Sequence, residues 1–374
     1  MEEETEDRLH RGRFKANLAS ASGLHELRFR KNTNKLPMNT QKNLSIETLR
    51  GIAVLLVVMG HVIGSAPDGG MKIDYPHPLR YVYVWIDYIQ MPLFTAIAGW
   101  VYALKPFSLT GSFFGFARKK ALRLLVPMAV VGTLYFLIQY IMPGTNSKGD
   151  LSRIIRIYFF PYTIYWYLPS LFIIFLIQWT IDRYKKMETP AQWCAWCVLA
   201  IVLSVTNDKG LMHQLPNLFS FKGALGQLPF FFAGVAACRF APALYRSAWV
   251  KRMMWISVPA GIVLIQIVWF CPGVAASWSR LLYPVTLIPT LFLLLSLPWR
   301  NRFFTWLGGY AYSIYLFHGF GTSGGRILLK MAGIESIPVL FPSVTFIATL
   351  GPVVVDKVAR RFKWGRILLL GKPA

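Results

Sequence analysis

The stretch from Ile46 to Ala66, IETLRGIAVLLVVMGHVIGSA, decides the fold class of this protein. Its apolar run is long enough to cross a bilayer, which takes about 20 residues of helix. Nine further stretches of similar character follow, so we expect an all-α, polytopic membrane bundle of ten transmembrane helices. The expected spans are 46–66, 81–104, 121–142, 162–182, 191–206, 223–238, 253–271, 281–298, 304–321 and 337–356.

The composition of the whole chain agrees with this class. Of its 374 residues, 55% are hydrophobic and 15% are charged, whereas a soluble domain carries about a quarter charged residues. These values exclude an ordinary soluble enzyme, and the high hydrophobicity excludes a disordered chain. The cysteines lack the second CxxC pair that a structural zinc site needs. We therefore expect Cys194, Cys197, Cys238 and Cys271 to act in packing, and we expect no metal site.

The net charge of +24 comes from cations in the short connectors between apolar stretches. This distribution is typical of the positive-inside rule and argues against nucleic acid as a partner. Binding to nucleic acid stays open only for the N-terminal tail. With the N-terminus in the cytoplasm and ten spans, Lys and Arg show a roughly threefold excess on the cytoplasmic side. We expect a flexible polar cytoplasmic tail over 1–43, a transmembrane domain over 44–358 and a basic cytoplasmic tail over 359–374.

Two ionisable residues in the first span point to chemistry. Arg50 and His61 are eleven residues apart, so they share one helix face about 16 Å apart along the axis. Such groups inside a membrane are functional candidates by default. Arg50 has an alternative role as the ion-pair partner of Glu47, and His61 as a helix–helix hydrogen bond. Together, the guanidinium can hold a phosphate and the neutral imidazole can take a proton from a hydroxyl. We expect them to line one passage.

The sequence around these two residues resembles the acyltransferase-3 family of integral-membrane O-acyltransferases, which have ten spans and an Arg-x10-His signature in the first. This chain differs from the family pattern at Gln90, where a His is frequent, and at Lys120, where the family has Arg. Three further stretches carry the resemblance: Met91-Pro92-Leu93-Phe94 with Ala98-Gly99-Trp100, Lys120-Ala121-Leu122-Arg123 with Pro127, and Tyr312-Ser313-Ile314-Tyr315-Leu316-Phe317-His318.

The resemblance implies an acyl-CoA-dependent O-acyltransferase, most simply an O-acetyltransferase, in a bacterial inner membrane. Acetyl-CoA or another acyl-CoA would be the donor substrate, with no bound cofactor, and the acceptor a hydroxyl of a cell-envelope or exported glycan or glycolipid. His61 would be the base or the acyl carrier, assisted by Arg50. Expected donor contacts are Arg50, Lys120, Arg123 and Arg118, and expected acceptor or oxyanion contacts are Tyr315, His318 and Ser313.

These additional residues can also have roles in topology or helix packing that involve no substrate. The cations near 118–123 also fit topogenic positive-inside charges, and Tyr315 and His318 also fit interhelical hydrogen bonds. Cations in the connectors expected outside suggest contact with an acidic polysaccharide or with lipid headgroups. They are Lys72, Arg80, Lys148, Arg153, Arg156, Arg280, Arg326 and Lys330.

A transporter or flippase of a glycan or lipid-linked substrate is the alternative function, because ten spans alone fit it. Many transporters, however, consist of two matched halves with interrupted helices, and the sequence shows no such halves. The acceptor, the length of the acyl group and the oligomeric state are left open by the sequence.

Overall fold

The computed structural model describes residues 43–104, 111–146, 150–207 and 214–372, with the side chains of 274–280 left out. By its internal contacts the chain divides into Met1–Asn43 and Leu44–Ala374, and only the second unit is discussed below. The predictions for the tail over 1–42 and for Lys148 therefore lie outside the described residues, as does the side chain of Arg280.

Every regular element in the described residues is helical, so the all-α prediction is confirmed. The described residues form thirteen α-helices, joined by three short 3₁₀ turns and followed by one π turn. The α-helices are α2 (Leu44–Ile63), α3 (Pro78–Ala103), α4 (Phe113–Ile141), α5 (Arg156–Phe159), α6 (Tyr167–Arg183), α7 (Pro190–Thr206), α9 (Phe221–Arg239), α10 (Ala241–Arg246), α11 (Ala248–Phe270), α12 (Pro272–Ser296), α13 (Arg302–Gly309), α14 (Ala311–Met331) and α15 (Ile337–Ala359). The short turns are η1 (Leu151–Arg153), η2 (Thr163–Trp166), η3 (Leu218–Ser220) and η4 (Gly365–Leu369).

Six segments of the described chain are long and apolar enough to cross a membrane, and two further helices are apolar but shorter. The six are Leu44–Ile63, Phe113–Ile141, Leu151–Arg183, Leu218–Arg239, Ala248–Phe270 and Ile337–Ala359. The long helices α3 and α14 are not among them, since polar residues interrupt both. The expected count of ten spans and the side on which each end lies stay predictions.

One expected span is interrupted. The range 304–321 was predicted as a single helix, but the structure has α13 and α14 with a break at Tyr310, whose φ is −108° and ψ is 2°. The Gly308–Gly309 pair directly before it explains the break, because glycine is a poor helix former. As a result the α13 axis is free to follow α2 while α14 takes its own direction.

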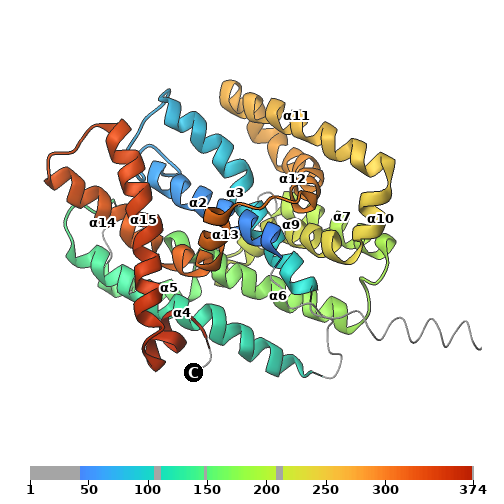
Figure 1. Cartoon of the computed structure of the whole chain (residues 1–374), viewed down its shortest axis with the longest axis horizontal. Coiled ribbons are helices and arrows are strands. Elements are labelled where there is room, and N and C mark those ends of the chain that lie inside the picture. Colours follow the sequence, from blue (N-terminus) through green and yellow to red (C-terminus); the bar gives the residue numbers. More distant parts are fainter. Residues whose placement is uncertain (1–42, 105–110, 147–149, 208–213, 373–374) are drawn as a thin grey trace, which may run out of the picture. The chain divides into compact units, whose positions relative to one another are not determined.

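Helix α2 packs against α3, α13, α14 and α15 (Figure 1). Without water to expel, helices inside a membrane associate by close packing, which small residues favour. A methyl group at Gly51 of α2 would overlap the carbonyl of Phe304, and one at Gly308 of α13 would overlap the carbonyl of Glu47. Glycines therefore set the distance between α2 and α13.

The same device joins α3 to α9. A methyl group at Gly99 would overlap the carbonyl of Phe231, and one at Gly234 would overlap the carbonyl of Ala96. The two backbones are in direct contact along this line. The two pairs of glycines thus let α2 pack closely against α13 and α3 pack closely against α9. Helices α2 and α3 carry most of the polar residues discussed below.

The segment after α15 folds back onto α4. Leu370 is only 2% exposed, and Gly371, with a φ of +58°, lies against the backbone of Arg123. The segment expected as a basic tail over 359–374 is thus packed up to this point, and it reaches the end of the bundle where Arg123 lies.

We predict that Gly234→Ala lowers the thermal stability of the protein, because its new methyl group must push α9 away from α3. Overpacking of this kind costs about 1–3 kcal/mol. Gly226→Ala on the same helix is the matched control: a methyl group there meets nothing within 4 Å, and alanine favours the helix by up to about 1 kcal/mol. Thermal unfolding in detergent should show opposite shifts for the two variants, and equal shifts would contradict this account of the packing.

Candidate functional site

The structure brings His61 and His318 together. His61 is half-buried in the last turn of α2, and His318 is fully buried in α14. Their ring centres lie 5.0 Å apart with an angle of 39° between the planes. Of the two rings beside His318, that of His61 is the nearer, since the ring of Tyr315 lies at 6.0 Å. A residue expected to be catalytic thus meets one expected to serve the acceptor.

The hydrogen bonds of His318 fix its tautomer. Its Nδ1 lies 2.7 Å from the carbonyl oxygen of Tyr315 and 3.1 Å from that of Ile314. A carbonyl only accepts, so Nδ1 carries the proton and Nε2 has a free lone pair. This Nε2 is buried and has no hydrogen-bond partner among the described residues. Buried acceptors are rarely left unpaired, so the atom is available to a polar group beside it.

Tyr315 and Ser313 are committed to other partners. The Tyr315 hydroxyl donates to the carbonyl of Ile164, and in return Tyr165 donates to the carbonyl of Leu316 at 3.1 Å. This reciprocal pair fastens η2 to α14. Ser313 instead donates to Asp356 of α15, so the structure does not bring its hydroxyl to the two histidines.

Arg50 lies at the other end of α2 and has two partners. Its Nε donates to the carbonyl of Gly308 at 2.9 Å, and its Nη2 forms an ion pair with Glu47. The side chain remains 28% exposed. Val54 and Val57 lie on the face between Arg50 and His61 and are fully buried. The expected passage along this face is therefore filled by packed valines in this structure.

The cations of α4 lie at the same end of the bundle as Arg50. The Arg123 carbonyl accepts a hydrogen bond of 2.6 Å from Tyr312, four residues after the Gly308 that binds Arg50. The Arg123 side chain is exposed, as is that of Arg118. Lys120 is half-buried with its Nζ 3.4 Å from the centre of the Phe175 ring, a cation–π contact with α6.

A buried ion pair beside Lys120 was missed by the sequence reasoning. Asp182 of α6 receives two hydrogen bonds from Arg239 of α9, at 2.7 and 2.6 Å, and further ones from Tyr102 and Gln178, both at 2.9 Å. The Tyr102 ring also lies 5.9 Å from the Phe175 ring on which Lys120 rests. In the sequence, Asp182 and Arg239 each stand at the end of an apolar stretch, a position that charged residues exposed to solvent commonly take. Their pairing is therefore visible only in the structure.

Two cations expected to face an acidic acceptor are instead buried. Arg80 is 0% exposed, and its guanidinium donates to four carbonyls at the end of α2 and in the loop after it. These belong to Ile63, Gly64, Ala66 and Ile73, at 2.6–3.1 Å. Arg326 is 6% exposed and donates to the carbonyl of Gly144. For these two the expectation is wrong, because helix ends and loops leave carbonyls that need donors.

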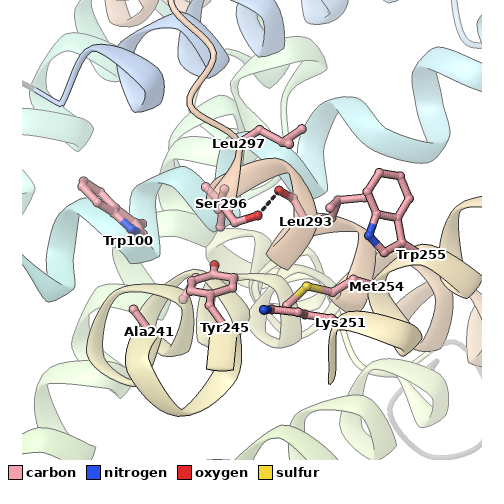
Figure 2. Close-up of a pocket in the computed structure, with 11 residues that line it drawn as sticks. Trp100, Ala241, Tyr245, Lys251, Met254, Trp255, Leu293, Ser296 and Leu297 are labelled. Carbon is pink, nitrogen blue, oxygen red and sulfur yellow. Dashed lines mark hydrogen bonds between the residues drawn. The ribbon is translucent and has the colours of Figure 1, made fainter. Parts of the chain in front are cut away.

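A pocket of about 560 Å³ lies away from both Arg50 and His61 (Figure 2). Its walls come from the ends of α3, α9 and α12 and the starts of α10 and α11, with the Ser296 hydroxyl bonded to the Leu293 carbonyl at 2.7 Å. Figure 2 shows Trp100 and Trp255 on opposite sides in this view. The lining residues are Trp100, Ala237, Ala241, Tyr245, Lys251, Met254, Trp255, Leu293, Leu295, Ser296 and Leu297.

The comparison with protein families gives one match, a model described as an acyltransferase domain, of the acyltransferase-3 type, over residues 43–357. The matched range includes all of α2 to α14 and nearly all of α15. No curated protein and no solved structure matches the chain. The resemblance seen in the sequence is thereby confirmed over most of its length.

We predict that Arg80→Gln destabilises the protein strongly, because it leaves buried carbonyls without donors at about 1–3 kcal/mol each. Arg153→Gln is the control, since that side chain is 71% exposed and its one ion-pair partner among the described residues is Asp150. Thermal unfolding in detergent should show a large fall for the first variant and little change for the second. A stable Arg80→Gln protein would contradict the role given to this guanidinium.

Proposed function

The chain belongs to the acyltransferase-3 family and is a multi-pass membrane acyltransferase, and from this we propose which groups it joins. An acyl group, acetyl in the simplest case, passes from acyl-CoA on the cytoplasmic side to a hydroxyl of a cell-envelope or exported glycan, in a bacterial inner membrane. The observation that carries the proposal is the contact of His61 with His318 inside the bundle.

In the reaction, His61 takes the proton of the acceptor hydroxyl as its oxygen attacks the thioester carbonyl carbon. The new C–O bond forms, the C–S bond breaks, and the proton passes to the departing thiolate of CoA. In this step the Nε2 of His318, which has no partner among the described residues, would accept a hydrogen bond from the other ring nitrogen of His61. Such a bond would orient the imidazole and stabilise its cationic form. Tyr315 serves this arrangement through its carbonyl, which holds His318.

His61 can also act as the acyl carrier. Its ring nitrogen would then attack the thioester first, release CoA and give the acyl group to the hydroxyl in a second step. Both routes use the same residue and differ in whether CoA is released without an acceptor. A burst of free CoA from acyl-CoA and enzyme alone would support the carrier route.

Donor binding falls to the cations at the Arg50 end of the bundle. CoA carries several phosphate charges, which guanidinium groups bind in a bidentate way and ammonium groups bind as point charges. Arg50, Arg123 and Arg118 are at least partly exposed there. Since Val54 and Val57 fill the face between Arg50 and His61, the acyl arm of the donor must part α2 from its neighbours to reach the imidazole.

We predict that His61→Ala lowers the acyl-transfer rate about 10²–10⁴-fold, the contribution expected of a general base. His77→Ala is the control, because the described residues give the His77 side chain a single hydrogen bond, which its ring accepts from the backbone N–H of Leu79 at the start of α3. The measurement is release of CoA and acylation of glycan in cells or nanodiscs. Normal acylation by the His61→Ala variant would reject both roles proposed for this histidine.

We predict that Lys120→Gln raises the KM for acyl-CoA several-fold, whereas Lys119→Gln changes it little. Lys120 is half-buried against Phe175 and falls on the family motif, while its neighbour Lys119 is exposed. Kinetics at saturating acceptor separate the donor KM from kcat. Equal effects of the two substitutions would indicate that both lysines act only through overall positive charge.

A further inference from the structure

Asp87 is a carboxylate in the middle of a helix that is expected to cross the membrane. It lies nine residues from the start of α3, about 14 Å along the helix, and its side chain is exposed. Among the described residues it has no ion-pair partner. A charged group facing lipid is costly, and such residues face the bundle interior or a polar cavity. On this principle we expect the exposed surface of Asp87 to face water or a polar substrate.

Hydrogen bonds connect Asp87 to the turn that carries His61. Its Oδ1 accepts from the Tyr83 hydroxyl at 3.2 Å and from Gln90 Nε2 at 3.3 Å. Gln90 is 6% exposed, and its Oε1 lies against Gly60, where a methyl group would come within 2.7 Å of it. Gly60 directly precedes His61, so a single side chain separates the carboxylate from the catalytic turn.

Both of these hydrogen bonds go to Oδ1 of Asp87, and neither goes to Oδ2. The described residues give Oδ2 no hydrogen bond, while Tyr83 and Gln90 fix the plane of the carboxylate. An ionised carboxylate only accepts hydrogen bonds, so its natural ligand is a donor. Half-buried His61 and exposed Asp87 are thus two accessible polar groups on adjacent helices, one suited to take a proton and one suited to hold a hydroxyl.

We propose that Asp87 binds a hydroxyl of the acceptor sugar next to the one that is acylated, and that it selects neutral sugars over acidic ones. This inference rests on the proposed function. A neutral sugar offers hydroxyl donors to the carboxylate, and such charge-assisted hydrogen bonds are strong. A sugar carboxylate at the same place meets a like charge. Arg80, which lies on the same helix, does not offset that repulsion, because its guanidinium is buried and bonded to backbone carbonyls.

The test compares two acceptors, methyl glucopyranoside and the matching glucopyranosiduronate, with wild type and Asp87→Asn in nanodiscs. Wild type should prefer the neutral acceptor by at least about tenfold in kcat/KM. Asp87→Asn should raise the KM for the neutral acceptor about tenfold, the equivalent of one charge-assisted hydrogen bond, and should weaken the preference. The KM for acyl-CoA should not change. Asp74→Asn is the control, since this exposed carboxylate lies in the loop before α3.

Two further variants cover the case in which Asp87→Asn does not fold. Asp87→Glu keeps the charge and should still reject the uronate, and Tyr83→Phe removes one hydrogen bond and should raise the acceptor KM less. An unchanged acceptor preference in the Asp87→Asn variant overturns the inference, as does a fall in kcat alone that is equal for both acceptors. The matching methyl glucosaminide serves as a third acceptor for the wild type. A preference for it over the neutral glucoside also overturns the inference, because the carboxylate would then bind an ammonium group.

The same assay separates this inference from the proposed function. If wild type acylates the neutral glycoside and the Asp87 variants behave like it, only the role of Asp87 is lost. If wild type releases no CoA with either glycoside, the glycan-acylating function fails and the inference falls with it.

Discussion

Helix α2 is held at both of its ends, and these contacts fix where its polar side chains lie. Gly51 and Gly308 let the backbones of α2 and α13 touch, and Arg80 holds the opposite end of α2 through its carbonyls. Both ends of the helix are thereby fixed, so His61 has a defined place relative to His318 on α14. Dispersion and backbone contact do this work, because apolar surface gains little from burial when lipid is the solvent.

The treatment of charge inside the bundle follows from the same low-dielectric surroundings. Arg80, Arg326, Asp182 and Arg239 are buried or nearly so, and each is bonded to a carbonyl or to an opposite charge. Such groups stabilise the fold and are not available to a substrate. Asp87 differs, because it keeps exposed surface. In this molecule, charged side chains whose hydrogen bonds are all made within the bundle are structural. A charged side chain that keeps exposed surface is a candidate substrate contact.

The two ends of the proposed reaction are joined by packed side chains. Segment 308–312 contacts Arg50 and Arg123 at one end, and α14 continues from it to His318. Val54 and Val57 occupy the face of α2 between the two ends. A donor arm that inserted beside them would exchange one set of apolar contacts for another, so these valines would not bar an acyl chain. Once a donor is bound, apolar side chains packed around its acyl arm would keep water away from the thioester.

Hydropathy and helical period are local properties of the chain, so they were enough to predict most of the helices, the shared face of Arg50 and His61 and the family. It failed at the break near Tyr310, where a glycine pair lies inside an apolar run, and it treated Arg80 and Arg326 as surface cations. Three contacts became visible only in the folded chain: His318 meets His61, Ser313 donates to Asp356, and Gln90 lies between Asp87 and Gly60. Each of these is a contact between residues far apart in the chain or on different helices, and no local pattern specifies which faces will meet.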